Sequence, residues 1–129
     1  MIKHDTILLE HGGGGLLTHD LIAGVFLPLF RNPCLNRLED SAVLELQGQR
    51  LCFTTDSYVV SPLFFPGGDI GSLAVHGTIN DLAMSGGSPL ALSCGFIIEE
   101  GFPLEQLRRI CSSMAAAAQR AGVQIVTGD

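Results

Sequence analysis

Basic residues are scarce in this sequence: Lys3 is the only lysine, and seven Lys and Arg residues face 13 Asp and Glu, for a net charge of −6. A nucleic-acid-binding domain needs clustered Lys and Arg, so this composition argues against one. A P-loop needs a lysine directly after its glycine-rich turn, where it contacts the outer phosphates. Because Lys3 precedes every glycine-rich segment, the sequence excludes the P-loop way of binding a polyphosphate.

Paired cysteine motifs and long apolar runs are also lacking. The four cysteines, Cys34, Cys52, Cys94 and Cys111, form no C-x-x-C pair and have no histidine at a zinc-finger interval, so we expect reduced thiols rather than disulfides or a zinc site. The N-terminus has no signal-peptide pattern, and no apolar stretch approaches the ~20 residues that span a bilayer. We therefore predict one cytoplasmic domain that binds no membrane.

Patterns of strand and helix alternate along the chain. Residues 18–31 predict a helix with Thr18 as its N-cap, bent or ended by Pro28. Residues 41–47 and 50–56 predict a hairpin around Gly48, and residues 89–100 predict a long strand. Two more helices are expected at residues 69–86 and 103–121, and a last strand begins near residue 123. Since that strand ends in Gly-Asp, we expect the chain to be the N-terminal part of a larger protein.

Aspartates stand where these expected elements begin, end or turn inward: Asp40, Asp56, Asp81 and Asp129. Carboxylates repel phosphate unless a divalent cation lies between them, and Mg²⁺ binds through carboxylates, substrate phosphates and water. The pattern therefore predicts a nucleotide phosphate held through metal ions.

Asp81 is central to that prediction. At helical spacing it falls on one apolar stripe of the 69–86 helix, made of Ile70, Leu73, Ala74, Gly77, Asp81 and Met84. A buried carboxylate needs a metal, an ion pair or backbone hydrogen bonds. Because the chain has few cations, we favour metal binding over a buried salt bridge, with Asn80 beside it as a supporting ligand.

Two glycine-rich segments have alternative interpretations. Asp69 follows Gly67 and Gly68 at the start of a helix, which favours an N-cap role over direct catalysis, while the glycines allow an anion to approach the helix start. The segment from His11 to Gly15 either covers a phosphate or is a mobile linker. Its His11 either contacts phosphate or is solvated, and spacing alone does not decide.

Four segments carry a resemblance to a known family: LEDSAVL, TTDSYVVSPLFFPGGDIGSLAVHGTINDLAMSGGSPLALS, IIEEGFPLEQL and VTGD. Together they resemble the hydrogenase maturation factor HypE, within the superfamily of aminoimidazole ribonucleotide synthetase and selenophosphate synthetase. The resemblance extends over essentially the whole chain, and the stretch 54–93 is its most specific part.

The resemblance implies a fold and an activity. The fold is α+β, the N-terminal domain of the aminoimidazole ribonucleotide synthetase-like (PurM-like) fold, with a mixed sheet and helices on one face. HypE-like proteins are ATP-dependent dehydratases that convert a carbamoyl group on their C-terminal cysteine into a thiocyanate, the source of the cyanide ligands of [NiFe] hydrogenases. We therefore expect residues 1–129 to be an ATP-binding and dimerisation domain in hydrogenase maturation.

The resemblance also implies ligands and partners. Asp40, Asp56 and Asp81 are expected to bind Mg²⁺, and the ATP site is expected to use these three with the remaining candidates, Gly67, Gly68, Asp69, Asn80, Gly128 and Asp129. Expected partners are a second copy of the chain, the carbamoyltransferase HypF and the HypC–HypD complex. The unpaired edges of the predicted hairpin also favour a homodimer, because exposed strand edges aggregate.

Two features differ from the family pattern. The C-terminal domain and its Pro-Arg-Ile-Cys tail are missing, and none of the four cysteines replaces the acceptor cysteine, so we expect a partial site without complete dehydratase chemistry. The glycine-rich segment is followed by Leu16 and Leu17 rather than a basic residue. A selenophosphate or purine-pathway synthetase, or a non-catalytic docking module, remain the alternatives.

Overall fold

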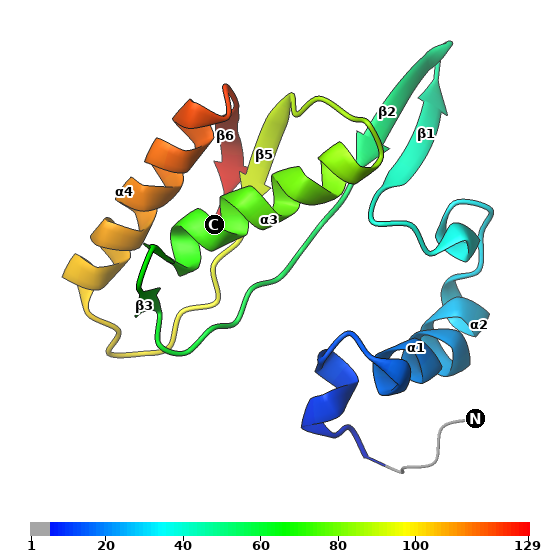
Figure 1. Ribbon diagram of the computed structural model, residues 1–129, viewed down its shortest axis with the longest axis horizontal. Coiled ribbons are helices and arrows are strands. Elements are labelled where there is room, and N and C mark those ends of the chain that lie inside the picture. The colour runs from blue at the N-terminus through cyan, green and yellow to red at the C-terminus, as the bar shows by residue number, and fades with distance from the viewer. Residues whose placement is uncertain (1–5) are drawn as a thin grey trace.

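The computed structural model describes residues 6–129, so Lys3 lies outside the described part. The chain is an α+β domain (Figure 1) whose elements run η1 Leu9–Gly12, α1 Leu16–Leu21, η2 Ile22–Phe26, α2 Leu27–Phe30, η3 Leu35–Arg37, β1 Ala42–Leu46, β2 Gln49–Phe53, β3 Phe64–Phe65, β4 Gly68–Asp69, α3 Ile70–Met84, β5 Ala91–Cys94, α4 Leu104–Arg120 and β6 Gln124–Gly128. Its described strands form three two-stranded sheets. None of its described helices is long and apolar enough to cross a membrane.

The N-terminal helix begins earlier than predicted. Its N-cap is Gly15, and the expected N-cap, Thr18, was wrong. The Thr18 hydroxyl instead donates to the His11 carbonyl at 2.7 Å and accepts from the Gly14 N–H at 2.9 Å, so it closes the glycine-rich turn. A π-helical segment, η2, comes directly before α2, which carries Pro28 in its first turn and ends at Phe30. This matches the expected disturbance at Pro28, since proline removes a helical hydrogen bond.

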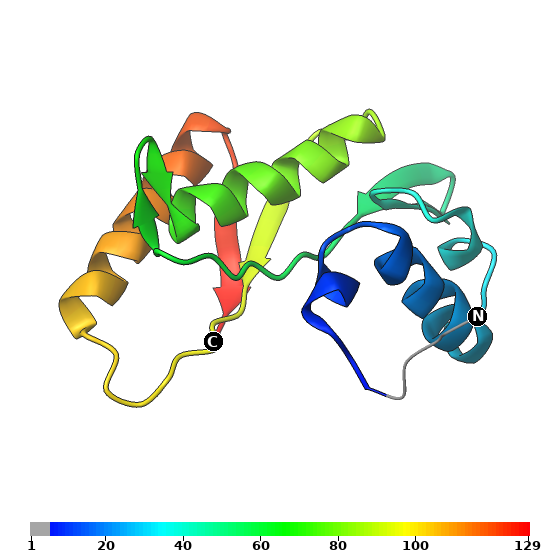
Figure 2. The ribbon, with the colours of Figure 1, turned by 60° about the horizontal axis from the view of Figure 1, so that its bottom comes forward.

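The predicted hairpin is confirmed. Strands β1 and β2 pair antiparallel from Ala42 opposite Phe53 to Leu46 opposite Gln49. The two turn residues, Gln47 and Gly48, both have positive φ, at 51° and 81°. Such a turn matches the right-handed twist of the paired strands. In both views the N-terminal helices lie on the hairpin's side of the molecule, away from α4 (Figures 1 and 2).

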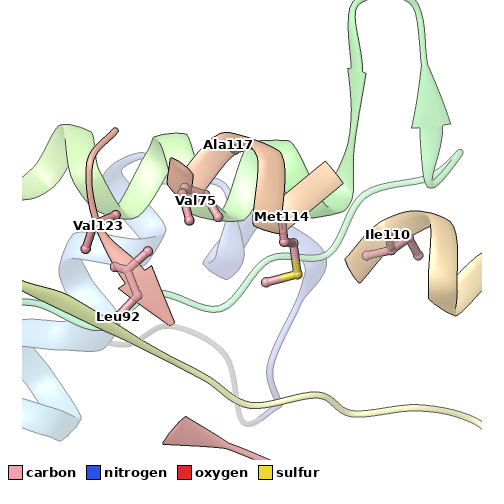
Figure 3. Packing of buried hydrophobic residues seen from close by; sticks show 7 residues of the cluster. Val75, Leu92, Ile110, Met114, Ala117 and Val123 are labelled. Carbon is pink, nitrogen blue, oxygen red and sulfur yellow. The ribbon is translucent and has the colours of Figure 1, made fainter. Parts of the chain in front are cut away.

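The core lies where α3 and α4 pack against each other and against the parallel pair β5–β6. Its buried residues come from α3, α4, β5 and the position just before β6, and Figure 3 labels all but Ala118: Val75, Leu92, Ile110, Met114, Ala117, Ala118 and Val123. The helix expected at 103–121 is confirmed as α4, with Pro103 as its N-cap. The last predicted strand is confirmed as β6, which pairs with β5.

The long strand predicted over 89–100 was wrong in length, because β5 holds only Ala91–Cys94. Pairing with β6 ends at Gly128, and only the bond from the Phe96 N–H to the Asp129 carbonyl, at 2.8 Å, continues it. Beyond that point Ile97 is fully exposed. The apolar pattern of residues 89–100 therefore predicted the position of the strand but not its length.

The predicted buried stripe of α3 was also wrong. The buried residues of this helix are Gly71, Val75 and Leu82, whereas Leu73 is 38% and Met84 67% exposed. The rotation of α3 is set by α4, which crosses so closely at Gly71 that an added Cβ would lie 2.7 Å from both the Met114 Cγ and the Ser113 Oγ. Asp81 consequently lies half-buried beside the core face.

Candidate functional site

The hairpin brings two of the predicted aspartates to one place. Asp40 precedes β1 and Asp56 follows β2, so antiparallel pairing puts both at the open end of the hairpin. A hydrogen bond of 3.0 Å from the Thr54 hydroxyl to the Asp40 carbonyl closes this end. Both aspartates are exposed. The positions that sequence reasoning selected are therefore neighbours because of the hairpin register.

Asp81 joins them from α3. Burial raises the pKa of the Asp81 carboxyl, and the negative charges of Asp56 and Asp40 raise it further. Among the described residues, every group that shifts this pKa raises it, and none of these groups is a cation or a donor that stabilises the ionised form. The three carboxylates form the carboxylate cluster, defined as Asp40, Asp56 and Asp81.

The chemistry of this cluster fits a divalent cation, although its side chains do not enclose one. Within residues 6–129, no three His, Cys, Asp or Glu side chains are close enough together to hold a metal ion. Mg²⁺ keeps several waters and is commonly held by one or two carboxylates plus substrate phosphates. A cation at the cluster would remove the repulsion that raises the Asp81 pKa. The donor set therefore fits Mg²⁺ shared between protein, water and phosphate.

Two contacts between side chains connect the segments carrying Asp40 and Asp56 to α3, and sequence reasoning missed both. The buried Ser41 hydroxyl donates to the Ser85 Oγ at 2.6 Å. The Tyr58 hydroxyl donates to the Asp56 carboxylate at 3.3 Å and lies 3.4 Å from the Thr78 Oγ1. The sequence feature that could have pointed to these contacts is proximity, since Ser41 and Tyr58 closely follow Asp40 and Asp56.

Asp69 is an N-cap, as favoured from the sequence. Its Oδ1 accepts a hydrogen bond from the Ser72 N–H at 2.9 Å and another from the Ser113 hydroxyl on α4. Burial alone would raise the pKa of this carboxyl, but the bonds from Ser113, Ser72 and Gly71, with the nearby charge of Arg109, outweigh it and lower the pKa. Asp69 thus fixes the start of α3 against α4.

The glycines before Asp69 have local structural roles. Gly67 has φ of 92°, a backbone conformation that favours glycine. A Cβ added to Gly68 would lie 2.8 Å from the Ser72 Oγ. Both positions therefore require glycine for local reasons, in addition to any role in approaching an anion at the N-terminus of α3.

The remaining predicted residues lie at other places. Asn80 is exposed on α3, next to Asp81. Gly128 lies directly against the Cys94 backbone, where a Cβ would collide with the Cys94 carbonyl. Asp129 is exposed after β6 and is not among the carboxylates that shift the Asp81 pKa. The structure brings together three of the four aspartates first selected.

The glycine-rich segment is locally ordered around His11. This side chain is 5% exposed, and its Nδ1 accepts a hydrogen bond from the Leu8 N–H at 2.9 Å. The alternative in which His11 is solvated is therefore wrong, because the turn from η1 into α1 encloses the ring. His76 is exposed on α3.

Two hollows adjoin the carboxylate cluster. A groove of about 640 Å³ between α3, β5 and residues 95–99 has mainly apolar walls, with Asp56, Tyr58 and Thr78 at its lining. A second hollow of about 390 Å³ is lined by Asp40, Arg37 and Arg50 among others. Arg37 ends η3 and Arg50 lies on β2, and the fold brings both to the same hollow as Asp40.

The family comparison agrees with this arrangement. The pattern of the AIR synthase related protein family, N-terminal domain, matches residues 38–129, which include the hairpin, both long helices and all three members of the carboxylate cluster. The chain belongs to this family. The expected α+β fold of the PurM-like N-terminal domain is thereby confirmed.

Two relatives show how similar the chain is to curated proteins. The carbamoyl dehydratase HypE of Azotobacter vinelandii is 55% identical to it over 128 residues, which cover 99% of this chain and 38% of that protein. The HypE of Escherichia coli K12 is 53% identical over 130 residues, 97% of this chain and 39% of its own. The chain therefore spans about two-fifths of the relatives it matches. These matches confirm the resemblance to HypE.

Solved structures give the same result. A chain in a crystal structure of a HypE–HypF complex is 56% identical with a TM-score of 0.77, over 84% of this chain and 35% of that one. A HypE crystal structure in complex with ATP is 56% identical with a TM-score of 0.62, over 96% of this chain and 37% of that one.

Proposed function

We propose that this chain supplies the N-terminal part of the Mg-ATP site of a HypE-type carbamoyl dehydratase. In that reaction ATP phosphorylates the amide oxygen of a cysteine S-carboxamide, and loss of phosphate leaves the S-cyanide used for the iron ligands of [NiFe] hydrogenase. The observation that carries the proposal is the carboxylate cluster, in a chain more than half identical to proteins named carbamoyl dehydratase HypE.

The carboxylates and the glycines would have different roles at the proposed site. Asp40, Asp56 and Asp81 would hold Mg²⁺, which when bound screens their charges from the phosphates. Gly67 and Gly68 would let a phosphate approach the N-terminus of α3, where the helix dipole favours an anion. The first N–H groups of this helix are already bonded, Ile70 to the Leu63 carbonyl and Gly71 and Ser72 to the Asp69 carboxylate. Asp69 would keep that helix start in place, because its carboxylate is already occupied by Ser72 and Ser113. Asn80, Gly128 and Asp129 remain further candidates for contacts to the nucleotide.

The catalytic step would need groups outside these residues. The proposed reaction modifies a C-terminal cysteine, and Cys34, Cys52, Cys94 and Cys111 all lie within this domain. Burial raises the pKa of the Cys94 thiol, with a smaller contribution from Cys111, which makes it a poor nucleophile. We therefore assign nucleotide binding to this chain and expect no complete turnover from it alone.

The hairpin supports the proposed homodimer. It is a two-stranded sheet with Leu46 55% and Phe53 61% exposed, and such a hairpin is marginally stable without further strands or packing. Pairing with a second copy would cover these side chains. HypF, present in the solved complex of a relative, and the HypC–HypD complex are the other proposed partners, and the proposed location is the cytoplasm.

Calorimetric titration with ATP tests the function. The chain should bind ATP in the presence of Mg²⁺ and lose most of that binding when EDTA removes the metal. Asp81→Asn, which keeps the side-chain shape, should weaken Mg²⁺-dependent binding about tenfold or more, as expected when one charged ligand is removed. Glu100→Gln, an exposed carboxylate in a loop, is the matched control and should bind like the parent chain.

Two results would contradict this proposal. Absence of ATP binding would leave the docking-module alternative, in which the domain only dimerises and binds maturation partners. Equal binding with and without Mg²⁺ would show that the carboxylate cluster does not act through a metal.

A further inference from the structure

Asp81 lies between two anchor points on one face of α3. Thr78, Asp81 and Ser85 are spaced by three and four residues, which puts them on the same side of a helix. Thr78 contacts Tyr58, and Ser85 contacts Ser41. Each contact therefore reaches α3 within about one turn of Asp81, one on either side.

Each anchor also lies next to an aspartate of the opposing segment. Ser41 directly follows Asp40, and Tyr58 is two residues after Asp56, whose carboxylate it contacts. Since a tyrosine hydroxyl has one proton and Tyr58 donates it to Asp56, Thr78 is the donor in the other contact. Thr78 on α3 therefore donates a hydrogen bond to Tyr58, and Tyr58 donates one to the Asp56 carboxylate.

Packing reinforces both anchors. Ser41 is only 3% exposed, so its hydroxyl has little access to water and relies on Ser85. Tyr58 lies against Gly77, where an added Cβ would collide with the phenol. The glycine in α3 thus provides the space that lets the tyrosine reach both Thr78 and Asp56.

We infer that Ser41 and Tyr58 are positioning residues, which hold Asp40 and Asp56 beside Asp81 so that one Mg²⁺, with its waters and the nucleotide phosphates, can be shared between them. This inference rests on the proposed function and adds to it the side chains that fix the metal site. Without the two anchors, the Thr54 bond to the Asp40 carbonyl would still close the hairpin end, but the exposed Asp40 and Asp56 would be held less firmly beside Asp81. Mutual repulsion of the three charges favours their separation.

The test separates metal affinity from nucleotide affinity. Ser41→Ala removes the hydroxyl at little change in volume, and Tyr58→Phe keeps the ring against Gly77. For the parent chain and each variant, ATP binding is titrated calorimetrically at a series of Mg²⁺ concentrations. We expect each substitution to raise the Mg²⁺ concentration for half-maximal ATP binding about two- to tenfold, the range of one lost hydrogen bond. ATP affinity at saturating Mg²⁺ should change little.

Asn32→Ala is the matched control. Its side chain accepts hydrogen bonds from the N–H groups of Cys34 and Leu35, both at 3.0 Å, in the N-terminal part of the chain. It should lose stability comparably and leave the Mg²⁺ requirement unchanged. An unchanged Mg²⁺ requirement in both Ser41→Ala and Tyr58→Phe would overturn this inference but not the proposed function. A parent chain without Mg²⁺-dependent ATP binding would overturn the proposed function, and the inference with it.

Discussion

Replacing Asp69 by Asn isolates the contribution of one buried charge to the α3–α4 junction. Asn caps helices about as well as Asp, so the substitution keeps the cap and the acceptor oxygen but removes the negative charge. Two donors face that oxygen, the Ser72 N–H and the Ser113 hydroxyl, with the charge of Arg109 nearby. The stability of the variant therefore measures the contribution of the negative charge rather than that of the side-chain shape.

The magnitude follows from the bonds. A hydrogen bond to a charged group contributes about 1.5–3 kcal/mol and a neutral one about 0.5–1.5 kcal/mol, so two bonds lose about 2 kcal/mol together. The helix N-terminus adds about 0.5 kcal/mol in favour of the anion. Because the variant no longer buries a charge, it regains about 1 kcal/mol of stability from the removed desolvation cost. We expect Asp69→Asn to lower the free energy of unfolding at pH 7 by about 1–2 kcal/mol.

The pH dependence gives the sharper test. The folded pKa of Asp69 is lower than its unfolded value of about 3.9, so its stabilisation is fully present above that value and is lost as pH falls through the folded pKa. Urea unfolding followed by circular dichroism, at equal protein concentration and at pH 7, 4 and 2.5, should show the two proteins converging in acid. Glu100→Gln should stay within about 0.5 kcal/mol of the parent at pH 7. A difference independent of pH, or a more stable variant at pH 7, would refute the assigned role of the charge.

Two further predictions concern packing and assembly. Gly71→Ala should lower the free energy of unfolding by about 1 kcal/mol, because overpacking against Met114 and Ser113 costs about 1–3 kcal/mol and outweighs the roughly 1 kcal/mol gained in helix propensity; unchanged or increased stability in urea would contradict the close helix crossing. In light scattering the chain should have the mass of a dimer, and Phe53→Lys on the exposed hairpin should shift it toward monomer. A monodisperse parent monomer would contradict the proposed homodimer.

Sequence reasoning succeeded where the signal is local. The hairpin was readable from two β-prone runs around Gly48, and the starts of α3 and α4 from Asp69 and Pro103. These features depend on the backbone preferences of a few adjacent residues. Asp40, Asp56 and Asp81 were likewise selected from their places near strand ends or on a helix, and their role as metal ligands stays a prediction.

Features fixed by tertiary contact were not readable. The rotation of α3 depends on its closest approach to α4 at Gly71, and this moved Asp81 from the expected buried stripe to the edge of the core. The extent of β5 depends on pairing with residues 33 or 34 positions away in the sequence. The Ser41–Ser85 contact joins residues 44 positions apart, so no short window of sequence contains it.

The parallel pairing of β5 with β6 has a consequence for the order in which the chain folds. The hairpin needs only the two-residue turn at Gln47 and Gly48, so it can close as soon as β2 leaves the ribosome. The partner of β5 is β6, which follows α4 in the sequence. Parallel strands cannot pair until the whole crossover between them has been synthesised. During synthesis Leu92 therefore stays without its final cover until residues 104–128 have emerged. Apolar surface exposed during that interval can contact other nascent chains.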